Sequence, residues 1–296
     1  MADFIKYINE LFGITSATSA PIFITILVFA TGQVFIWIRT LFNGLIKRGK
    51  TRRLFKEIIK SAIITTQKQE KVFHESLDQM NFEQISNLVH KKIEFYQPRL
   101  LEEVGFNNSH YGFFDGIENF HKIRKNRLRS RAYIKCWEIM RTVDFWMQEG
   151  YNKMGEFGEK YNRYNDRRND ALKKLGKFND KLIQNHLGKE IDLNTQEGLY
   201  IFKVSEILKK FHERPDIKPH IIHKSIVVPL RILNRKFPKV SYITDMNEHL
   251  LEASISYENM YNVLKKQKIQ YSLYVCNFRY NYRTFQKALK ILTAKC

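Results

Sequence analysis

A run of apolar residues from 20 to 46, APIFITILVFATGQVFIWIRTLFNGLI, constrains this chain more than any other segment. Its first nineteen residues, Ala20 to Ile38, contain no ionisable side chain. A helix needs about 20 such residues to cross the hydrocarbon core of a bilayer. Trp37 and the basic segment KRGKTRR after the run are typical of a helix anchored at lipid headgroups. The sequence therefore predicts a transmembrane helix over 20–46; the alternative, a buried helix of a soluble domain, has no need of the basic flank.

The charges on the two sides of this run indicate its orientation. Residues 1–19 contain only Lys6, Asp3 and Glu10, whereas the segment from 39 to 60 has eight basic residues and one acid. The basic residues are Arg39, Lys47, Arg48, Lys50, Arg52, Arg53, Lys56 and Lys60. The positive-inside rule then places the long C-terminal part in the cytoplasm. We expect a retained single-pass anchor, because a cleaved secretory signal would need a basic N-terminus and an A-x-A site.

The chain is expected to be mainly α-helical with minor extended segments. We predict an amphipathic N-terminal segment at 1–19, the transmembrane helix at 20–46, and a basic stalk at 47–80 that continues it. A cytoplasmic, ligand-sensing helical domain is predicted at 81–296. Four prolines in its second half suggest a further boundary near 215–220.

Four segments of the cytoplasmic part have patterns that predict local structure. The sequence KIQYSLYV at 268–275 alternates like a strand, and IIHKSIVV at 221–228 reads as extended because it is rich in β-branched residues. Residues 105–116, GFNNSHYGFFDG, are predicted to form an ordered loop with buried aromatic rings. Residues 151–188 read as an exposed helix with i,i+4 charge pairs.

Polar and small residues form a stripe along the membrane helix. At 100° per residue, one line contains Thr25, Phe29, Gly32, Ile36 and Arg39. One interpretation is an oligomer seam or pore lining, in which the small residues allow close approach and Phe29 and Ile36 form a dewetting constriction. Gln33 lies about 80° from the line and also favours a neighbouring helix, because its amide is costly in lipid. The alternative is a chance pattern, with Arg39 reaching the headgroups.

The most basic window of the chain is 121–141, HKIRKNRLRSRAYIKCWEIMR. On a helix, one face of it carries Arg124, Arg127, Arg131 and Lys135, a spacing that could follow a phosphate backbone. Like charges at i,i+4 destabilise a helix, and no row of acids compensates them. We therefore predict a site for nucleic acid or another anion, with a solvated face as the alternative.

The C-terminal segment combines basic and aromatic side chains. No acid follows Glu258, and Arg279, Arg283 and Lys287 are interleaved with tyrosines and phenylalanines. Single-stranded nucleic acids are bound in this way, since cations contact phosphates and rings stack on bases. The alternative is that several of these rings belong to the core.

Net charge and the absence of catalytic motifs narrow the functional class. The residues after 46 carry the whole net charge of +20, which implies a polyanionic partner such as nucleic acid or anionic lipid. No nucleophile elbow, Walker loop, dinucleotide fingerprint or zincin helix occurs in the sequence, so we expect no enzyme activity and no cofactor. His220 and His223 have no neighbouring carboxylate or cysteine row and are not expected to bind a metal.

In its domain order the chain resembles the transmembrane effectors of bacterial anti-phage defence. It has one N-terminal span, PIFITILVFATGQVFIWI, a basic juxtamembrane segment, KRGKTRR, and a helical remainder without enzyme motifs. Its positive charge is most similar to what the Hailong effector family needs, since those channels are gated by DNA oligomers that a partner nucleotidyltransferase makes. The resemblance covers the whole chain by domain order and charge, and carries over no residue roles. It implies a homo-oligomeric pore in the bacterial inner membrane, opened or closed by a short nucleic acid or nucleotide.

Two further classes remain open at this point. The protein could anchor nucleic acid at the membrane without conducting ions, since the same basic face would serve that role. It could also be a scaffold whose basic patches lie on anionic membrane lipid.

Overall fold

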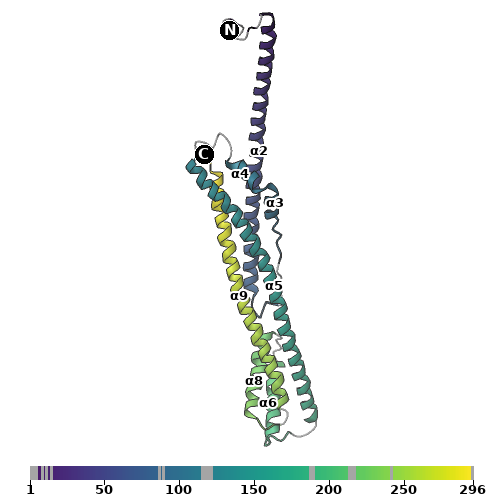
Figure 1. Cartoon of the computed structure of the whole chain (residues 1–296). Helices are drawn as coiled ribbons and strands as arrows, with labels where there is room; N and C mark the ends of the chain where they lie inside the picture. Colours follow the sequence, from purple (N-terminus) through teal and green to yellow (C-terminus); the bar gives the residue numbers. More distant parts are fainter. Residues whose placement is uncertain are drawn as a thin grey trace. The chain divides into compact units, whose positions relative to one another are not determined.

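The computed structural model describes residues 6–7, 10, 13, 16–85, 88, 91–114, 123–186, 191–212, 218–240 and 243–294. Within these ranges the chain is mostly helical and contains no strand, which confirms the mainly α-helical prediction. Figure 1 shows the three longest helices, which are α2 (Ser16–Gln79), α5 (Ile123–His186) and α9 (Ile243–Thr293). The predicted N-terminal segment at 1–19 lies largely outside the described residues.

Shorter helices connect the long ones. Between α2 and α5 lie α3 (Gln97–Val104) and α4 (Phe106–Phe114). Between α5 and α9 lie α6 (Gln196–His212), α7 (Pro219–Ile222), the π-helical turn η3 (His223–Val227) and α8 (Val228–Lys236). Half of the boundary predicted near 215–220, residues 215–217, lies outside the described residues, and α7 begins at Pro219.

The chain divides into two compact units, and each unit is assembled from segments far apart in the sequence. The first unit comprises Met1–Ser61, Tyr96–Ile134 and Leu289–Cys296. The second comprises Ala62–Phe95 and Lys135–Ala288. Helices α2, α5 and α9 each contribute residues to both units.

The core of the first unit forms around Phe55 of α2, which is fully buried. Its ring stacks on Tyr133 of α5 with centroids 5.1 Å apart, and contacts Phe113 of α4 edge-on at 5.3 Å. The Tyr133 hydroxyl donates to the carbonyl of Phe106 at 2.7 Å, so this polar group is satisfied inside the core. Helix α4 approaches α2 closely at Gly112. A methyl group added there would lie only 3.3 Å from the Thr51 side chain of α2.

The second unit has a ring cluster around Phe73 of α2. The Phe73 ring lies 4.9 Å from Tyr271, 5.3 Å from Phe278 and 5.6 Å from Tyr274, all on α9. Pairs of aromatic rings at such distances are more stable than their buried area alone predicts. On the α5 side, Gly150 leaves the space that the Phe73 ring occupies.

A separate apolar cluster in the second unit joins α6 and α8 to α5 and α9. It includes Leu175, Tyr200, Leu230 and Leu250, which are all buried. The Tyr200 hydroxyl donates to Asn234 Oδ1 at 2.7 Å inside this cluster. The cluster therefore fixes the short helices against the long ones.

Three local predictions are wrong, and each error has a physical cause. Residues 268–275 lie inside α9, because Tyr271, Tyr274 and Phe278 also fit a helical period and are all buried there. Residues 221–228 continue through α7 and η3 into α8, in whose first turn Pro229 is tolerated. The loop predicted at 105–116 is largely α4. Gly105, at φ 76°, ends α3 just before α4 begins.

Candidate functional site: the membrane helix, the basic surfaces and a cavity

Helix α2 is the one helix in the described ranges that is long and apolar enough to cross a membrane. Its most apolar stretch of 18 residues has a mean hydropathy of 2.1, and none of that stretch is buried against the rest of the chain. Side chains such as Phe29 and Phe35 are 67% and 69% exposed. Such apolar exposure is typical of a segment covered by lipid or by another helix. The buried-helix alternative would require this stretch to be covered by the chain itself.

The predicted seam residues all lie exposed on α2: Thr25, Phe29, Gly32, Gln33, Ile36 and Arg39. The Thr25 hydroxyl donates to the Pro21 carbonyl at 2.8 Å, so it is satisfied within its own helix and needs no neighbour. In the part of the chain that the structure describes, no hydrogen-bond partner reaches the Gln33 amide. A side chain added at Gly32 would meet nothing within 4 Å, which leaves room for a second helix there. The seam remains a prediction. Gly32 and Gln33 support it best, because Gly32 has space beside it and the Gln33 side chain lacks a hydrogen-bond partner in the described residues.

The structure brings the basic stalk and the basic window together in the first unit. Arg52 and Lys56 of α2 lie near Arg129 of α5, and these three residues are called the basic cluster below. Burial, followed by the guanidinium groups of Arg129 and Arg52, lowers the pKa of the Lys56 ammonium. Arg52 Nε donates to the Gly112 carbonyl, and Arg129 Nη2 donates to the Leu292 carbonyl at 3.4 Å. An anion bound here would relieve the mutual repulsion of these charges.

The basic face predicted on α5 is only partly open to solvent-borne ligands. Arg127 and Arg131 are exposed one turn apart. Lys135 is exposed but forms an ion pair with Glu138 at 3.0 Å. The side chain of Arg124 lies outside the described residues.

The C-terminal basic and aromatic residues divide between core and surface. Tyr271, Tyr274, Phe278 and Phe285 are buried, so these rings pack in the protein, as the core alternative proposed. Arg279 forms an ion pair with Glu70 of α2, with Nη2 at 2.7 Å from Oε1. Arg283 and Lys287 are exposed.

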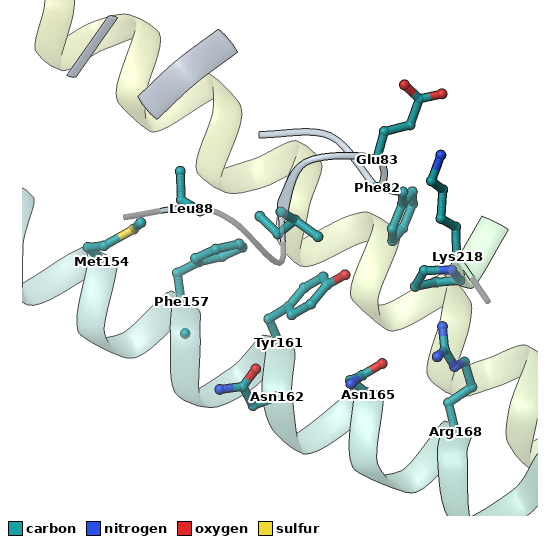
Figure 2. Close-up of a pocket in the computed structure, with 13 residues that line it drawn as sticks. Phe82, Glu83, Leu88, Met154, Phe157, Tyr161, Asn162, Asn165, Arg168 and Lys218 are labelled. Carbon is teal, nitrogen blue, oxygen red and sulfur yellow. The ribbon is translucent and has the colours of Figure 1, made fainter. Parts of the chain in front are cut away.

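The second unit contains a cavity of about 580 Å³ that was not predicted from the sequence (Figure 2). One wall is the stretch of α5 that was expected to be fully exposed, and Phe157, Tyr161 and Arg168 from that wall are buried. Phe82, after the end of α2, and Lys218, before α7, also line it. The signal in the sequence was the i,i+4 spacing of Phe157 and Tyr161, which marks a buried helical face among charged residues.

No family model, curated protein or solved structure matches this chain. The resemblance to anti-phage effectors therefore remains a prediction.

Proposed function

We propose that this protein is a non-enzymatic, homo-oligomeric membrane effector. Its N-terminal helix lines a pore, and a short nucleic acid or nucleotide bound to the basic helical part controls that pore. Anti-phage defence, with a nucleotidyltransferase supplying the ligand, is the setting that the resemblance implies. The observation that carries the proposal is the continuity of α2. The exposed apolar stretch and the buried residues Phe55 and Ile59 of the first unit belong to one unbroken helix.

Continuity of α2 gives the ligand a physical route to the membrane. A helix transmits displacement along its axis, because each turn is hydrogen-bonded to the next. A ligand that contacts one packing of the helices more strongly shifts the population toward it. A difference of about 5.5 kcal/mol in binding free energy takes a pore from 1:99 to 99:1 open. The bulky side chains of Phe29 and Ile36 would close such a pore by excluding water.

A membrane-anchored scaffold without conductance is the second candidate. The basic cluster supports it, because Arg52 follows Ile46 by about 9 Å along the helix axis, just beyond the predicted end of the span. Each Lys or Arg close to an anionic membrane surface contributes about 1 kcal/mol of binding free energy. In this case the protein would hold nucleic acid or anionic lipid at the membrane.

A membrane-potential dye in bacterial cells distinguishes the two candidates. We expect full-length protein to depolarise the cells on unrestrained expression and a deletion of residues 1–46 to be harmless. Phe29→Ser should leak without ligand, because a small polar group wets the constriction. The matched control is Leu27→Ser, which lies about 160° around the helix from Phe29 and loses similar apolar area.

Several outcomes would count against the pore. The deletion variant could be as toxic as full-length protein, or no condition could produce a conductance. Equal leakage from Leu27→Ser and Phe29→Ser would mean that impaired insertion, and not a constriction, causes the leak. The scaffold would then be the better function.

A further inference from the structure

Among the residues that the structure describes, Arg168 is a buried cation without an anion. Its side chain is 5% exposed, and only Nη2 is bonded, to Asn169 Oδ1 at 2.8 Å. Its Nε and Nη1 atoms have no hydrogen-bond partner, and no carboxylate of the described ranges forms an ion pair with it. Burial lowers the pKa of this guanidinium, and its ionisable neighbours include the phenols of Tyr161 and Tyr257 and the imidazole of His223. A buried charge with unmade hydrogen bonds is costly, so a bound anion would stabilise Arg168 in this position.

The cavity that Arg168 lines is built for more than a bare anion. Figure 2 shows the Arg168 and Tyr161 side chains extending from α5 toward Phe82 and Lys218. The volume of about 580 Å³ lies in the range of small-molecule sites. Phe157 and Tyr161 form an aromatic pair with centroids 5.8 Å apart, and the Phe82 ring stacks on Tyr257 at 5.3 Å. A planar ring fits among such side chains.

Polar groups on the same wall suit a heterocyclic base. Asn162 and Asn165 each provide one acceptor and two donor hydrogens, the set that reads the edge of a nucleobase. Burial raises the pKa of Tyr161 to about 12, so its hydroxyl stays a neutral donor at physiological pH. Glu83 also lines the cavity, and Figure 2 shows its carboxylate extending away from the ring of Phe82.

We infer that this cavity binds a single nucleotide, with Arg168 on the phosphate, Phe82, Phe157 and Tyr161 around the base, and Asn162 and Asn165 on the base edge. The inference rests on the proposed function, because it names the site at which the controlling ligand binds. It assigns that site to other residues than the exposed Arg127 and Arg131 that the sequence suggested. Arginine suits this role because its planar guanidinium matches phosphate oxygens and stays charged when buried.

Titration calorimetry on full-length protein in detergent tests the site with three probes: adenosine 5′-monophosphate, adenosine and inorganic phosphate. We expect the monophosphate to bind at least about tenfold more tightly than either fragment, since ring and phosphate both contribute. Arg168→Gln should weaken monophosphate binding by at least about tenfold. Tyr161→Leu should weaken binding of the monophosphate more than that of phosphate. The matched control is Arg167→Gln, an exposed neighbour on the same helix, which should bind within about twofold of wild type.

The melting temperature without nucleotide separates binding from a structural role. Arg168→Gln should melt at or above the wild-type temperature, because it removes an unpaired buried charge. Lower melting with unchanged binding would overturn the inference. So would equal losses in Arg167→Gln, equal affinity for adenosine and its monophosphate, or no binding up to about 10 mM.

This experiment is independent of conductance. If the monophosphate binds but no variant depolarises cells, only the pore proposal fails. If full-length protein depolarises cells while the monophosphate does not bind, only the cavity assignment fails.

Discussion

At the scale of single residues, Gly150 decides how the ring cluster of the second unit packs. A methyl group there would lie 2.5 Å from Cζ and 3.0 Å from Cε1 of Phe73. The Phe73 ring cannot move aside easily, because it is fully buried and contacts Tyr271 and Phe278. The absence of a side chain at 150 is therefore a packing requirement.

We predict that Gly150→Ala lowers the free energy of unfolding by about 1–3 kcal/mol, as is usual for overpacking, although alanine favours a helix by about 1 kcal/mol. The melting temperature, followed by circular dichroism in detergent, should fall by several degrees. Gly155→Ala is the control on the same helix, because a methyl group there meets nothing within 4 Å. It should stabilise the protein by up to about 1 kcal/mol. Similar stability of the two variants would show that the Phe73 ring has room to shift.

At the scale of elements, α2 has to satisfy two environments with one helix. Its N-terminal part exposes apolar side chains, while Phe55, Ile58 and Ile59 further along are buried in protein. Arg39 and Gln33 are among the polar exceptions in the exposed part. A solitary span with a glutamine in lipid is less stable than a span whose glutamine faces another helix.

We predict that full-length protein is a homo-oligomer whose α2 helices contact one another near Gly32. Gly32→Leu should weaken self-association at least about tenfold, because the added side chain holds the helices apart. Ala30→Leu, on a different side of the helix, is the control for a small-to-large change and should leave association unchanged. Mass measurement in mild detergent or nanodiscs gives the stoichiometry. A monomeric wild type, or equal loss in both variants, would rule out a seam at Gly32.

At the scale of the whole molecule, electrostatics is the dominant property. The net charge of +20 lies entirely after residue 46, so the protein should attract polyanions whatever their sequence. Ion pairs such as Lys135–Glu138 and Arg279–Glu70 neutralise some of the basic side chains, but Arg127 and Arg131 remain exposed.

We predict that a short single-stranded DNA binds full-length protein with an affinity that falls steeply with salt, because bound phosphates release counterions. Reversing two charges, with Arg127→Glu and Arg131→Glu, should weaken binding at least about tenfold and flatten the salt dependence. The control reverses Lys173 and Lys177, which are exposed at the same spacing on the same helix. Fluorescence anisotropy at several salt concentrations measures both. Equal effects in the two variants would mean that net charge, and not the α5 face, attracts the strand.

The sequence alone determined the properties that depend on local composition. The apolar run ending near Ile46, the basic flank and the helical class were all predictable, because length without charge and a 3.6-residue period need no knowledge of distant residues. The continuation of the span into the stalk was also predictable, since no proline or glycine pair interrupts it. Residues 268–275 were not, because an alternating pattern over eight residues also fits one buried face of a helix.

Only the tertiary structure decided which charged and aromatic residues are available to a ligand. Arg279 was predicted to contact phosphate, but its guanidinium pairs with Glu70, which lies 209 residues away in the chain. Arg168 was predicted to lie on an exposed helix, but folding buries it, and no acid of the described segments pairs with it. Each unit is built from distant segments, so burial and pairing depend on neighbours that no local pattern identifies. The free energy of a charge depends on its surroundings far more than on its own sequence position.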